Sequence, residues 1–288
     1  YNFLNLFGGM PSLQDLEKPE SELSSELYSS DNKLLGKYFR YNRSPVKFNE
    51  LSDELVTTLL VTEDIRFYEH SGIDLKGLVR ASYGVLKNVA TFGSSGLEGG
   101  GSTITQQLAK NLFKIRREKK GKLSGVPFLG LIISKVKEWI VAVKLEEFYT
   151  KKEILAMYLN TAEYGSNSYG IKVAAKTYFN KLPSELNYNE SSIIVGLLNK
   201  PTKYNPYFNP DNAVEKRAEI FYNLFKYNIV DQTAYDSLKM MGLELSYKVE
   251  NQNVGQATYF RTVVRNYLIN WAKENGYDLF SDGLKIYT

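Results

Sequence analysis

The chain of 288 residues contains no cysteine and a single histidine, His70. Without cysteine, disulfide bridges and zinc sites built on thiolates are both excluded. One histidine also excludes a histidine-rich metal site. The class of metal site that remains is a divalent cation held by carboxylate and phosphate oxygens.

Long hydrophobic runs and strong net charge are lacking too. No apolar run reaches the length of about 18 residues that would predict a transmembrane helix. The formal net charge of +4 is too weak to indicate nucleic acid, so we expect no nucleic-acid partner. Hydrophobic residues make up 43%, enough for a core in one large domain or two small ones. The chain begins at Tyr1 instead of methionine, so we expect a fragment of a longer protein.

Helical patterns dominate the sequence, with a few strands at its two ends. A hairpin is predicted over 27–41 with its turn at Asp31-Asn32, and the closing stretch 283–288 is predicted to be a strand that pairs with this hairpin. One helix is expected from near Ser52, and Asp211 and Asp231 are expected to cap two others. The apolar face of the helix over 134–149 is expected to include Trp139, Ile140, Val143 and Phe148. An amphipathic helix is predicted from Tyr259, Val263, Tyr267, Leu268 and Trp271.

The stretch 61–74 holds four acids together with His70. Glu63 and Asp64 lie at the end of an apolar helical run, where an acid is a candidate proton acceptor. The alternative is a solvated helix end without a chemical role, and this stretch alone favours that alternative.

A glycine-rich entry to a helix follows at Gly100-Gly-Ser-Thr. Thr103 and Gln106 have the spacing of a capping box. Such an entry presents backbone N–H groups at the positive end of the helix dipole, which suits a phosphate. The Gly-Lys-Ser/Thr ending of the Walker pattern is absent.

Six basic residues over 114–122 precede an apolar run, 126–133, which begins at Val126 and ends at Ile133. A basic cluster beside a short apolar run is typical of a segment that lies in a membrane interface. The alternative is a solvated loop followed by the start of a buried helix, and both interpretations stay open.

Five stretches, in this order, resemble the motifs of the peptidoglycan glycosyltransferase domain of class A penicillin-binding proteins, a family that polymerises lipid II. They are residues 63–73, 100–111, 135–138, 152–160 and 169–179. The resemblance runs from about Gly8 to the C-terminus and is most specific in the second stretch. It implies a lysozyme-like, mainly α fold with a large lobe, a smaller membrane-facing lobe and a few β-strands from a linker region.

The same resemblance implies a domain order and a location. Residues 1–48 would form a connector with the hairpin, 49–245 the glycosyltransferase domain, and 246–288 the start of a linker. A transpeptidase domain and an N-terminal membrane anchor are implied outside this sequence. The implied location is the outer, periplasmic face of the bacterial cytoplasmic membrane.

Site residues are carried over from the resemblance motif by motif. Glu63 matches the general base, and Glu138 matches a second Glu that orients substrate or helps the pyrophosphate leave through a cation such as Mg²⁺ or Mn²⁺. No organic cofactor is implied. Arg66 and His70 are expected to anchor their loop, as is Asp64, with direct catalysis by His70 as the alternative. Residues expected to contact substrate are Asp64, Ser102, Thr103, Gln106, Gln107, Lys110, Asn111, Lys135 and Lys137.

Two departures from the family pattern affect this carry-over. Ser134 stands where the third motif usually has arginine, and the segment before that motif is longer than expected. The phosphate-binding arginine is therefore unassigned, with Arg116 and Arg117 as candidates. Glu146 and Glu147 are interpreted as solvated helix residues.

The implied activity is polymerisation of lipid II into β-1,4 glycan with inversion and release of undecaprenyl pyrophosphate. Its partners are lipid II, the growing glycan chain, the membrane surface through 126–133 with its flanking basic residues, and other proteins of cell-wall synthesis. Two alternatives stay open: a lytic muramidase of lysozyme-like fold and a non-catalytic cell-wall scaffold. A pyrophosphate cradle favours the transferase, because a hydrolase of finished glycan has no use for one.

Overall fold

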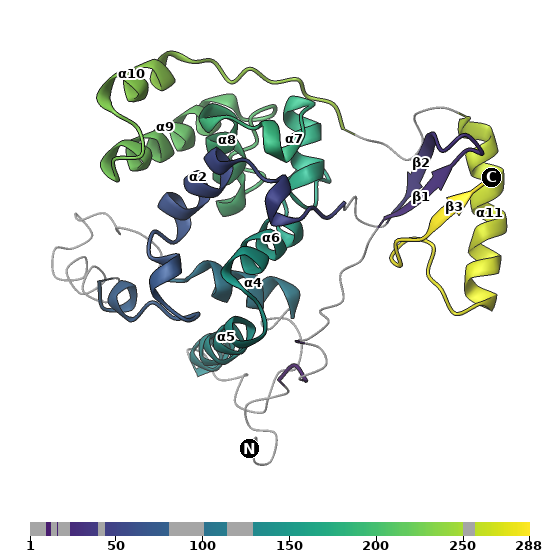
Figure 1. Cartoon of the computed structure of the whole chain (residues 1–288), viewed down its shortest axis with the longest axis horizontal. Helices are drawn as coiled ribbons and strands as arrows, with labels where there is room; N and C mark the ends of the chain where they lie inside the picture. The colour runs from purple at the N-terminus through teal and green to yellow at the C-terminus, as the bar shows by residue number, and fades with distance from the viewer. Residues whose placement is uncertain are drawn as a thin grey trace. The chain divides into compact units, whose positions relative to one another are not determined.

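The computed structural model describes residues 10–12, 16, 24–39, 44–80, 101–113, 129–249 and 257–288. This part of the chain is mainly helical and contains one three-stranded sheet, which confirms the predicted mainly α fold (Figure 1). Among the described helices, none is both long enough and apolar enough to cross a bilayer.

The chain divides into two compact units, and each is described by itself. The first contains Tyr1–Glu20 and Leu59–Tyr158, and the second contains Ser21–Thr58 and Leu159–Thr288. The boundaries between them fall inside the helices α2 (Asp53–Glu63) and α6 (Lys151–Thr161).

The described part of the first unit is mainly helical, and its helix α4 begins at the predicted cap Thr103. Its further elements are η3 (Phe67–Glu69), α4 (Ile104–Leu112) and α5 (Leu129–Phe148). α4 packs directly against α5. A capping box begins α6, because Thr150 N donates to Glu153 Oε2 and Glu153 N donates to Thr150 Oγ1.

The face that α5 buries differs from the predicted one. Ile140 and Phe148 are 44% and 41% exposed, so the expected apolar face is wrong at these positions. The side chains that α5 buries are Lys137, Glu138, Val141, Ala142 and Leu145. Because two of these are charged, a search for apolar periodicity places the buried face on the wrong side of the helix.

In the second unit, α8 lies between the helix that precedes it and the helix that follows it in the sequence. The helices of this part are α7 (Ile171–Phe179), α8 (Tyr188–Asn199), α9 (Pro210–Lys226) and α10 (Gln232–Met240), with η2 (Phe48–Glu50) and η5 (Pro183–Glu185) as single turns. α8 contacts both α7 and α9. Asp231 caps α10 as predicted, but the N-cap of α9 is Asn209. Pro210 takes the first helical position, which suits its fixed φ, and this moves Asp211 into the first turn.

The sheet joins the two ends of the second unit. β1 (Ser25–Tyr28) pairs antiparallel with β2 (Leu34–Tyr38) and parallel with β3 (Lys285–Tyr287), in the order β2-β1-β3. Glu26 lies opposite Lys285 and Leu27 opposite Ile286. The predicted hairpin and its pairing with the closing strand are therefore both confirmed.

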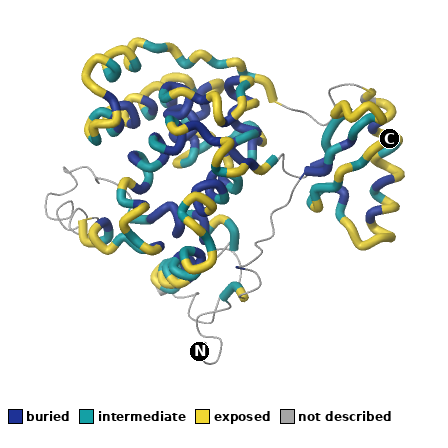
Figure 2. The backbone as a smooth tube through the Cα atoms, viewed as in Figure 1, coloured by how far each residue is buried: buried dark blue, intermediate teal, exposed yellow. Residues whose placement is uncertain are grey.

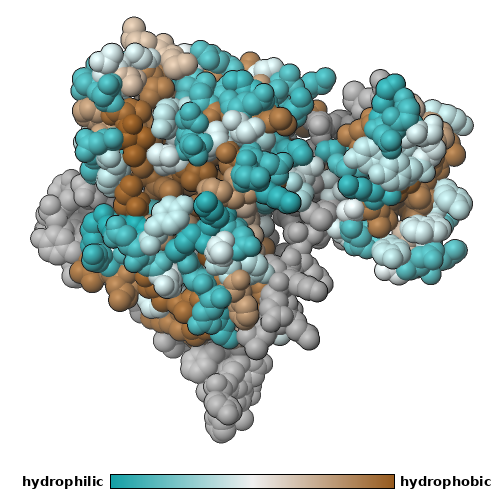
Figure 3. Space-filling model, in the orientation of Figure 1, coloured by the Kyte–Doolittle hydropathy of each residue, from teal (hydrophilic) through white to brown (hydrophobic). Residues whose placement is uncertain are grey.

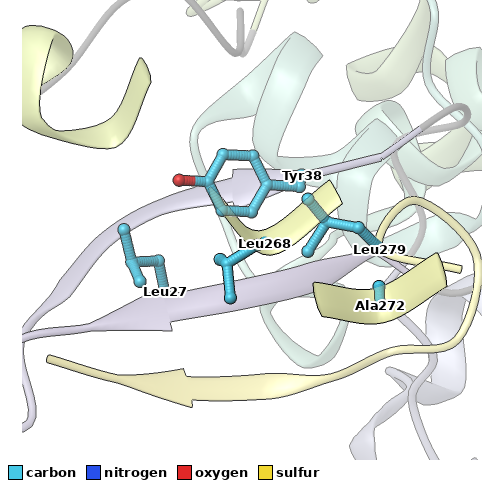
Figure 4. Close-up of a cluster of buried hydrophobic side chains, with 5 residues drawn as sticks. All are labelled: Leu27, Tyr38, Leu268, Ala272 and Leu279. Atoms are coloured by element: carbon cyan, nitrogen blue, oxygen red, sulfur yellow. The ribbon is translucent and has the colours of Figure 1, made fainter. Parts of the chain in front are cut away.

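One face of the sheet is covered by α11 (Thr258–Glu274). A cluster of buried side chains lies between sheet and helix: Leu27, Tyr38, Leu268, Ala272 and Leu279 (Figure 4). The Tyr38 hydroxyl donates to the Arg261 carbonyl oxygen at 2.7 Å, so the polar end of this buried ring is satisfied.

Four of the five residues predicted to form the apolar stripe of α11 are exposed. Tyr259, Val263, Tyr267 and Trp271 are 85%, 52%, 69% and 38% exposed, whereas Leu268 is 8% exposed. The alternation of buried and exposed turns is visible along this helix (Figure 2). The helix is amphipathic as expected, but of its buried side chains, Arg261, Leu268 and Ala272, only Leu268 belongs to the predicted stripe.

Candidate functional site

The loop after α2 is anchored by the acid that follows Glu63. Asp64 is 7% exposed, and its Oδ2 accepts a hydrogen bond of 3.0 Å from Ile104 N at the start of α4. His70 Nε2 lies 3.0 and 3.1 Å from the two oxygens of the same carboxylate. The sequence-based expectation that Asp64 and His70 fix the loop agrees with these contacts.

A second ion pair closes this loop. The Arg66 guanidinium is hydrogen-bonded to the Asp74 carboxylate, which also accepts from Gly77 N at 2.9 Å. Burial by itself would raise the pKa of Asp74, but the bonds from Arg66 and Gly77 and the charge of Arg66 outweigh it and lower the pKa. The hydrogen bond to Asp74 in turn raises the pKa of Arg66.

Gly72 brings the loop against both α4 and α5. Its carbonyl oxygen accepts from Thr103 Oγ1 at 2.7 Å and from Gln106 Nε2 at 3.2 Å. Its φ of +85° and the closeness of Ala142, whose carbonyl carbon would lie 2.8 Å from an added Cβ, both require glycine.

The N-terminus of α4 already holds a carboxylate. Ile104 N–H donates to Asp64, and Gln106 N–H donates to Thr103 Oγ1 at 3.2 Å. The Gln106 side chain donates to Gly72, so only half of the predicted capping box is made. The prediction that this helix end presents free N–H groups to a phosphate is therefore wrong for Ile104 and Gln106.

Glu63 is held at the other side of the same helix end. It is the last residue of α2 and is half-buried. Gln107 Nε2 donates to Glu63 Oε2 at 2.8 Å, and the Tyr158 hydroxyl donates to Gln107 Oε1 at 2.8 Å. These two hydrogen bonds fix the direction in which the Glu63 carboxylate points.

Glu138 and Lys135 form a pair on α5 that reaches the entry of α4. Glu138 is 2% exposed, and Lys135 Nζ lies 3.1 Å from its Oε2. The same Nζ donates to Ser102 Oγ at 2.6 Å. Ser102 directly precedes the N-cap Thr103, and Gln107 is the fourth residue of α4. Both acids are therefore linked to the N-terminal half of α4, Glu63 through Gln107 and Glu138 through Lys135.

Lys110 and Asn111 lie elsewhere on α4 than the sequence suggested. They belong to its last turn, at the negative end of the helix dipole, so they do not contribute to an N-terminal cradle. They are three and four positions after Gln107 and share its face, which is the face that contacts Glu63. Lys137, the other lysine expected beside Glu138, is 7% exposed.

Glu146 is not a solvated residue, contrary to the prediction. Its side chain is 7% exposed, accepts from Thr105 Oγ1 at 2.6 Å and lies 2.8 Å from Lys151 Nζ. Lys151 also donates to the carbonyl oxygen of His70 at 2.6 Å. Glu147 is exposed, as expected.

Sequence reasoning missed Lys151 and Tyr158 as members of the site. Lys151 is the first residue of α6, directly after the capping residue Thr150, and this position in the sequence does not indicate its contacts with Glu146 and His70. Tyr158 belongs to the buried stripe of α6, and a buried tyrosine hydroxyl needs a partner. The need of this hydroxyl for a hydrogen-bond partner was the signal that could have identified Tyr158 as a site residue.

Several predictions concern residues 116–134, of which the structure describes only those from 129 onward. Arg116, Arg117 and residues 126–128 lie outside the described residues. Ser134 Oγ donates to the Gly130 carbonyl oxygen of its own helix at 2.8 Å, so this position does not replace the arginine of the family pattern. Leu131 and Ile132 are 67% and 44% exposed.

The residues around Glu138 do not suit a metal ion held by the protein alone. Across the described ranges, no three histidine or acidic side chains come close enough to bind one. Glu138 is paired with Lys135, which supplies the positive charge that a cation would bring. A divalent cation here would need phosphate oxygens of a substrate as its other ligands.

Together these residues offer a proton acceptor and positive charge around one helix end. Glu63 has a fixed carboxylate, and Lys135 presents an ammonium group beside Ser102. This combination suits the transfer of a group from a phosphate leaving group to a hydroxyl.

Comparison with known proteins agrees with this chemistry. A sequence profile described as Transglycosylase matches residues 31–225, well over half of the chain. Penicillin-binding protein 1A of Escherichia coli (strain K12) is 32% identical over 279 residues, which cover 97% of this chain and 30% of the relative. The protein of that name from Aquifex aeolicus is 30% identical over 283 residues, which cover 98% of this chain and 36% of the relative.

The chain spans about a third of the length of the curated relatives it matches. A crystal structure of penicillin-binding protein 1A from Haemophilus influenzae aligns with 93% of this chain and 27% of that one, with a TM-score of 0.48 and 21% identity. The profile match contains Glu63, α4 and Glu138. The chain therefore belongs to the transglycosylase family, the peptidoglycan glycosyltransferases of class A penicillin-binding proteins.

Proposed function

We propose that the chain polymerises lipid II into β-1,4-linked glycan, with inversion at the anomeric carbon and release of undecaprenyl pyrophosphate. The observation that carries this proposal is the placement of Glu63 and the Lys135–Glu138 pair at one end of α4. One provides a base for an acceptor hydroxyl, and the other provides positive charge for a leaving pyrophosphate.

The proposed reaction needs one proton acceptor. Glu63 takes the proton of the acceptor sugar's 4-hydroxyl while that oxygen forms a bond to the donor's anomeric carbon. The bond from this carbon to the pyrophosphate oxygen breaks, and its electron pair stays on the pyrophosphate. Attack from the face opposite the leaving group gives inversion, and Gln107 keeps the carboxylate aimed during the step.

Positive charge for the pyrophosphate comes from side chains in this proposal. Lys135 is already placed by Ser102 and Glu138, and Lys110 lies on the face of α4 that reaches Glu63. Arg116 and Arg117 stay candidates for further phosphate contacts. The roles of Thr103, Gln106 and Asp64 are to hold the loop and α4 together, not to touch substrate.

The lytic muramidase and the scaffold are separated from the transferase by one pair of assays. The protein is incubated with lipid II in detergent, and separately with preformed glycan strands. Formation of polymer supports the transferase, and shortening of preformed strands supports the muramidase. Binding of lipid II without any product supports the scaffold.

Replacing Glu63 by Gln removes the base and keeps the size of the side chain. We expect polymerisation to fall at least a hundredfold, because general base catalysis contributes about 10² to 10⁴ in rate. Glu147→Gln, on the exposed side of α5, is the matched control and should keep the wild-type rate. Near-normal turnover by Glu63→Gln would show that the base is another residue.

A membrane surface is the proposed place of this reaction, because the substrate carries a lipid. Exposed apolar side chains on α5 support this: Leu131, Ile132, Val136 and Ile140. Hydrophobic surface is visible around the place where Figure 1 labels α5 (Figure 3). With the basic residues 114–122, it would place the domain on the outer face of the cytoplasmic membrane, close to other proteins of cell-wall synthesis.

The domain order proposed from the family is 49–245 for catalysis, flanked by a connector (1–48) and a linker (246–288). The pairing of β1 with β3 supports it, since strands from both flanking segments form one sheet.

A further inference from the structure

We infer that Tyr158 is a positioning residue, which acts through Gln107 to fix the orientation of the Glu63 carboxylate. This inference rests on the proposed function for its catalytic consequence. The hydrogen bonds on which it depends belong to α2, α4 and α6 and are independent of any substrate.

The tyrosine itself is held rigidly. Tyr158 is 2% exposed on α6, where Ile154, Leu155 and Leu159 are fully buried along the same stretch of helix. Its hydroxyl donates to Gln107 Oε1 at 2.8 Å. A buried ring that has little room to move presents its O–H group at a fixed point.

The direction of the two hydrogen bonds gives the amide one preferred orientation. With its oxygen facing Tyr158, Gln107 turns its NH₂ group to Glu63 and donates at 2.8 Å. The reverse orientation would point the amide oxygen at the carboxylate, where two acceptors meet without a proton. Only a protonated Glu63 could donate to that oxygen.

Tyr158 therefore sets the direction of the Glu63 carboxylate through the amide that lies between them. Its O–H favours the orientation in which Gln107 donates, and this donor holds Glu63 Oε2 in one place. Without the hydroxyl, Gln107 loses one reason to stay in this orientation. The carboxylate is then aimed at the acceptor hydroxyl in a smaller fraction of molecules.

The test is Tyr158→Phe, which removes one oxygen and keeps the ring. Polymerisation of lipid II is measured at pH 7 over a range of lipid II concentrations, beside the wild type. We expect kcat to fall about three- to tenfold with KM little changed, because a base that is aimed less often slows the chemical step and leaves binding alone.

Tyr164→Phe is the matched control. Tyr164 is also fully buried, and its hydroxyl donates to the Leu159 carbonyl oxygen at 3.1 Å. Its loss should lower thermal stability and leave kcat near the wild-type value. A wild-type kcat in Tyr158→Phe, or a rise in KM that accounts for the whole loss of activity, would overturn the inference.

A second measurement needs no activity. The carboxyl carbon resonance of Glu63 in ¹³C-labelled protein at pH 7, assigned with Glu63→Gln, should shift or broaden in Tyr158→Phe, because the hydrogen bond from Gln107 is made less often, and should stay in place in Tyr164→Phe. If the resonance changes but the wild type makes no polymer, the inference stands and the proposed function fails. If polymer forms but the resonance does not change, the inference fails alone.

Discussion

The Asp64 side chain places a carboxylate of the protein itself at the N-terminus of α4. Ile104 N–H and His70 hold it, so the place where a helix end would receive a phosphate is already filled. A negatively charged substrate must then meet side-chain cations in this site. In the proposed reaction, Lys135 and its neighbours would therefore bind the phosphate in place of the backbone N–H groups of α4.

Acid should weaken the loop through Asp74. The pKa of this group is lower in the folded protein than in the unfolded chain, so its contribution to stability is complete above the unfolded value of about 3.9. The contribution is lost as pH falls through the folded value. We expect Asp74→Asn to lower the free energy of unfolding by about 1–2 kcal/mol at pH 7, and the difference from wild type to shrink below about pH 4.

Denaturant unfolding at pH 7, 5, 4 and 3 measures this difference. Glu69→Gln, an exposed acid of the same loop, serves as the control and should change stability little. A difference that stays constant down to pH 3 would contradict the assignment of the pH dependence to Asp74.

Local patterns predicted those site residues whose partners are near in sequence or belong to a recognised motif. The cap at Thr103 needs only a donor three residues later, and such spacing is visible in the sequence. Glu146 and Lys151 were missed because their environment is made by Thr105 and His70, which arrive from other helices and loops. No spacing along the chain encodes these contacts.

At the scale of elements, helical period shows which residues share a face but not which face is covered. On α11, the stripe of Tyr259 and Val263 faces solvent while Leu268 is buried. On α5, the buried face includes Glu138, which an apolar count rejects. Elements were therefore predictable in position and type, whereas their packing depended on neighbours that the sequence pattern does not name.

The exposed side chains of α5 lead to a prediction about membranes. Ile132, Val136 and Ile140 are spaced by one turn and are each between 42% and 44% exposed. Replacing all three with serine should weaken binding to vesicles of anionic lipid about tenfold or more, because each buried apolar side chain contributes roughly 1 kcal/mol or more.

Sedimentation with vesicles containing phosphatidylglycerol measures this binding. Met240→Ser alters an exposed apolar side chain outside α5 and is the control. Unchanged binding of the triple variant would exclude α5 as the membrane contact.

At the scale of the whole molecule, the sheet ties together segments from opposite ends of the chain. Leu27 on β1 is fully buried against Leu268 and Ala272 of α11. Leu27→Ala should remove about 2–5 kcal/mol from the stability of this sheet and helix. Amide hydrogen exchange should show faster exchange in β1, β3 and α11.

Leu34→Ala is the matched control for this change, since Leu34 lies on β2 and is 46% exposed. It should leave the exchange rates near those of the wild type. Equal effects of the two substitutions would mean that the cluster in Figure 4 does not carry the stability of this part.

The pairing of Glu26 with Lys285 also sets an order in time. A ribosome that adds about 5–20 residues per second needs on the order of ten to fifty seconds to pass from one strand to the other. During this interval β1 has no partner strand on its β3 side, and Leu27 is not yet covered by α11. The helices encoded between the two strands can already form. The newborn chain therefore carries an unfinished sheet edge until β3 has been made, which is a period when a chaperone can protect it.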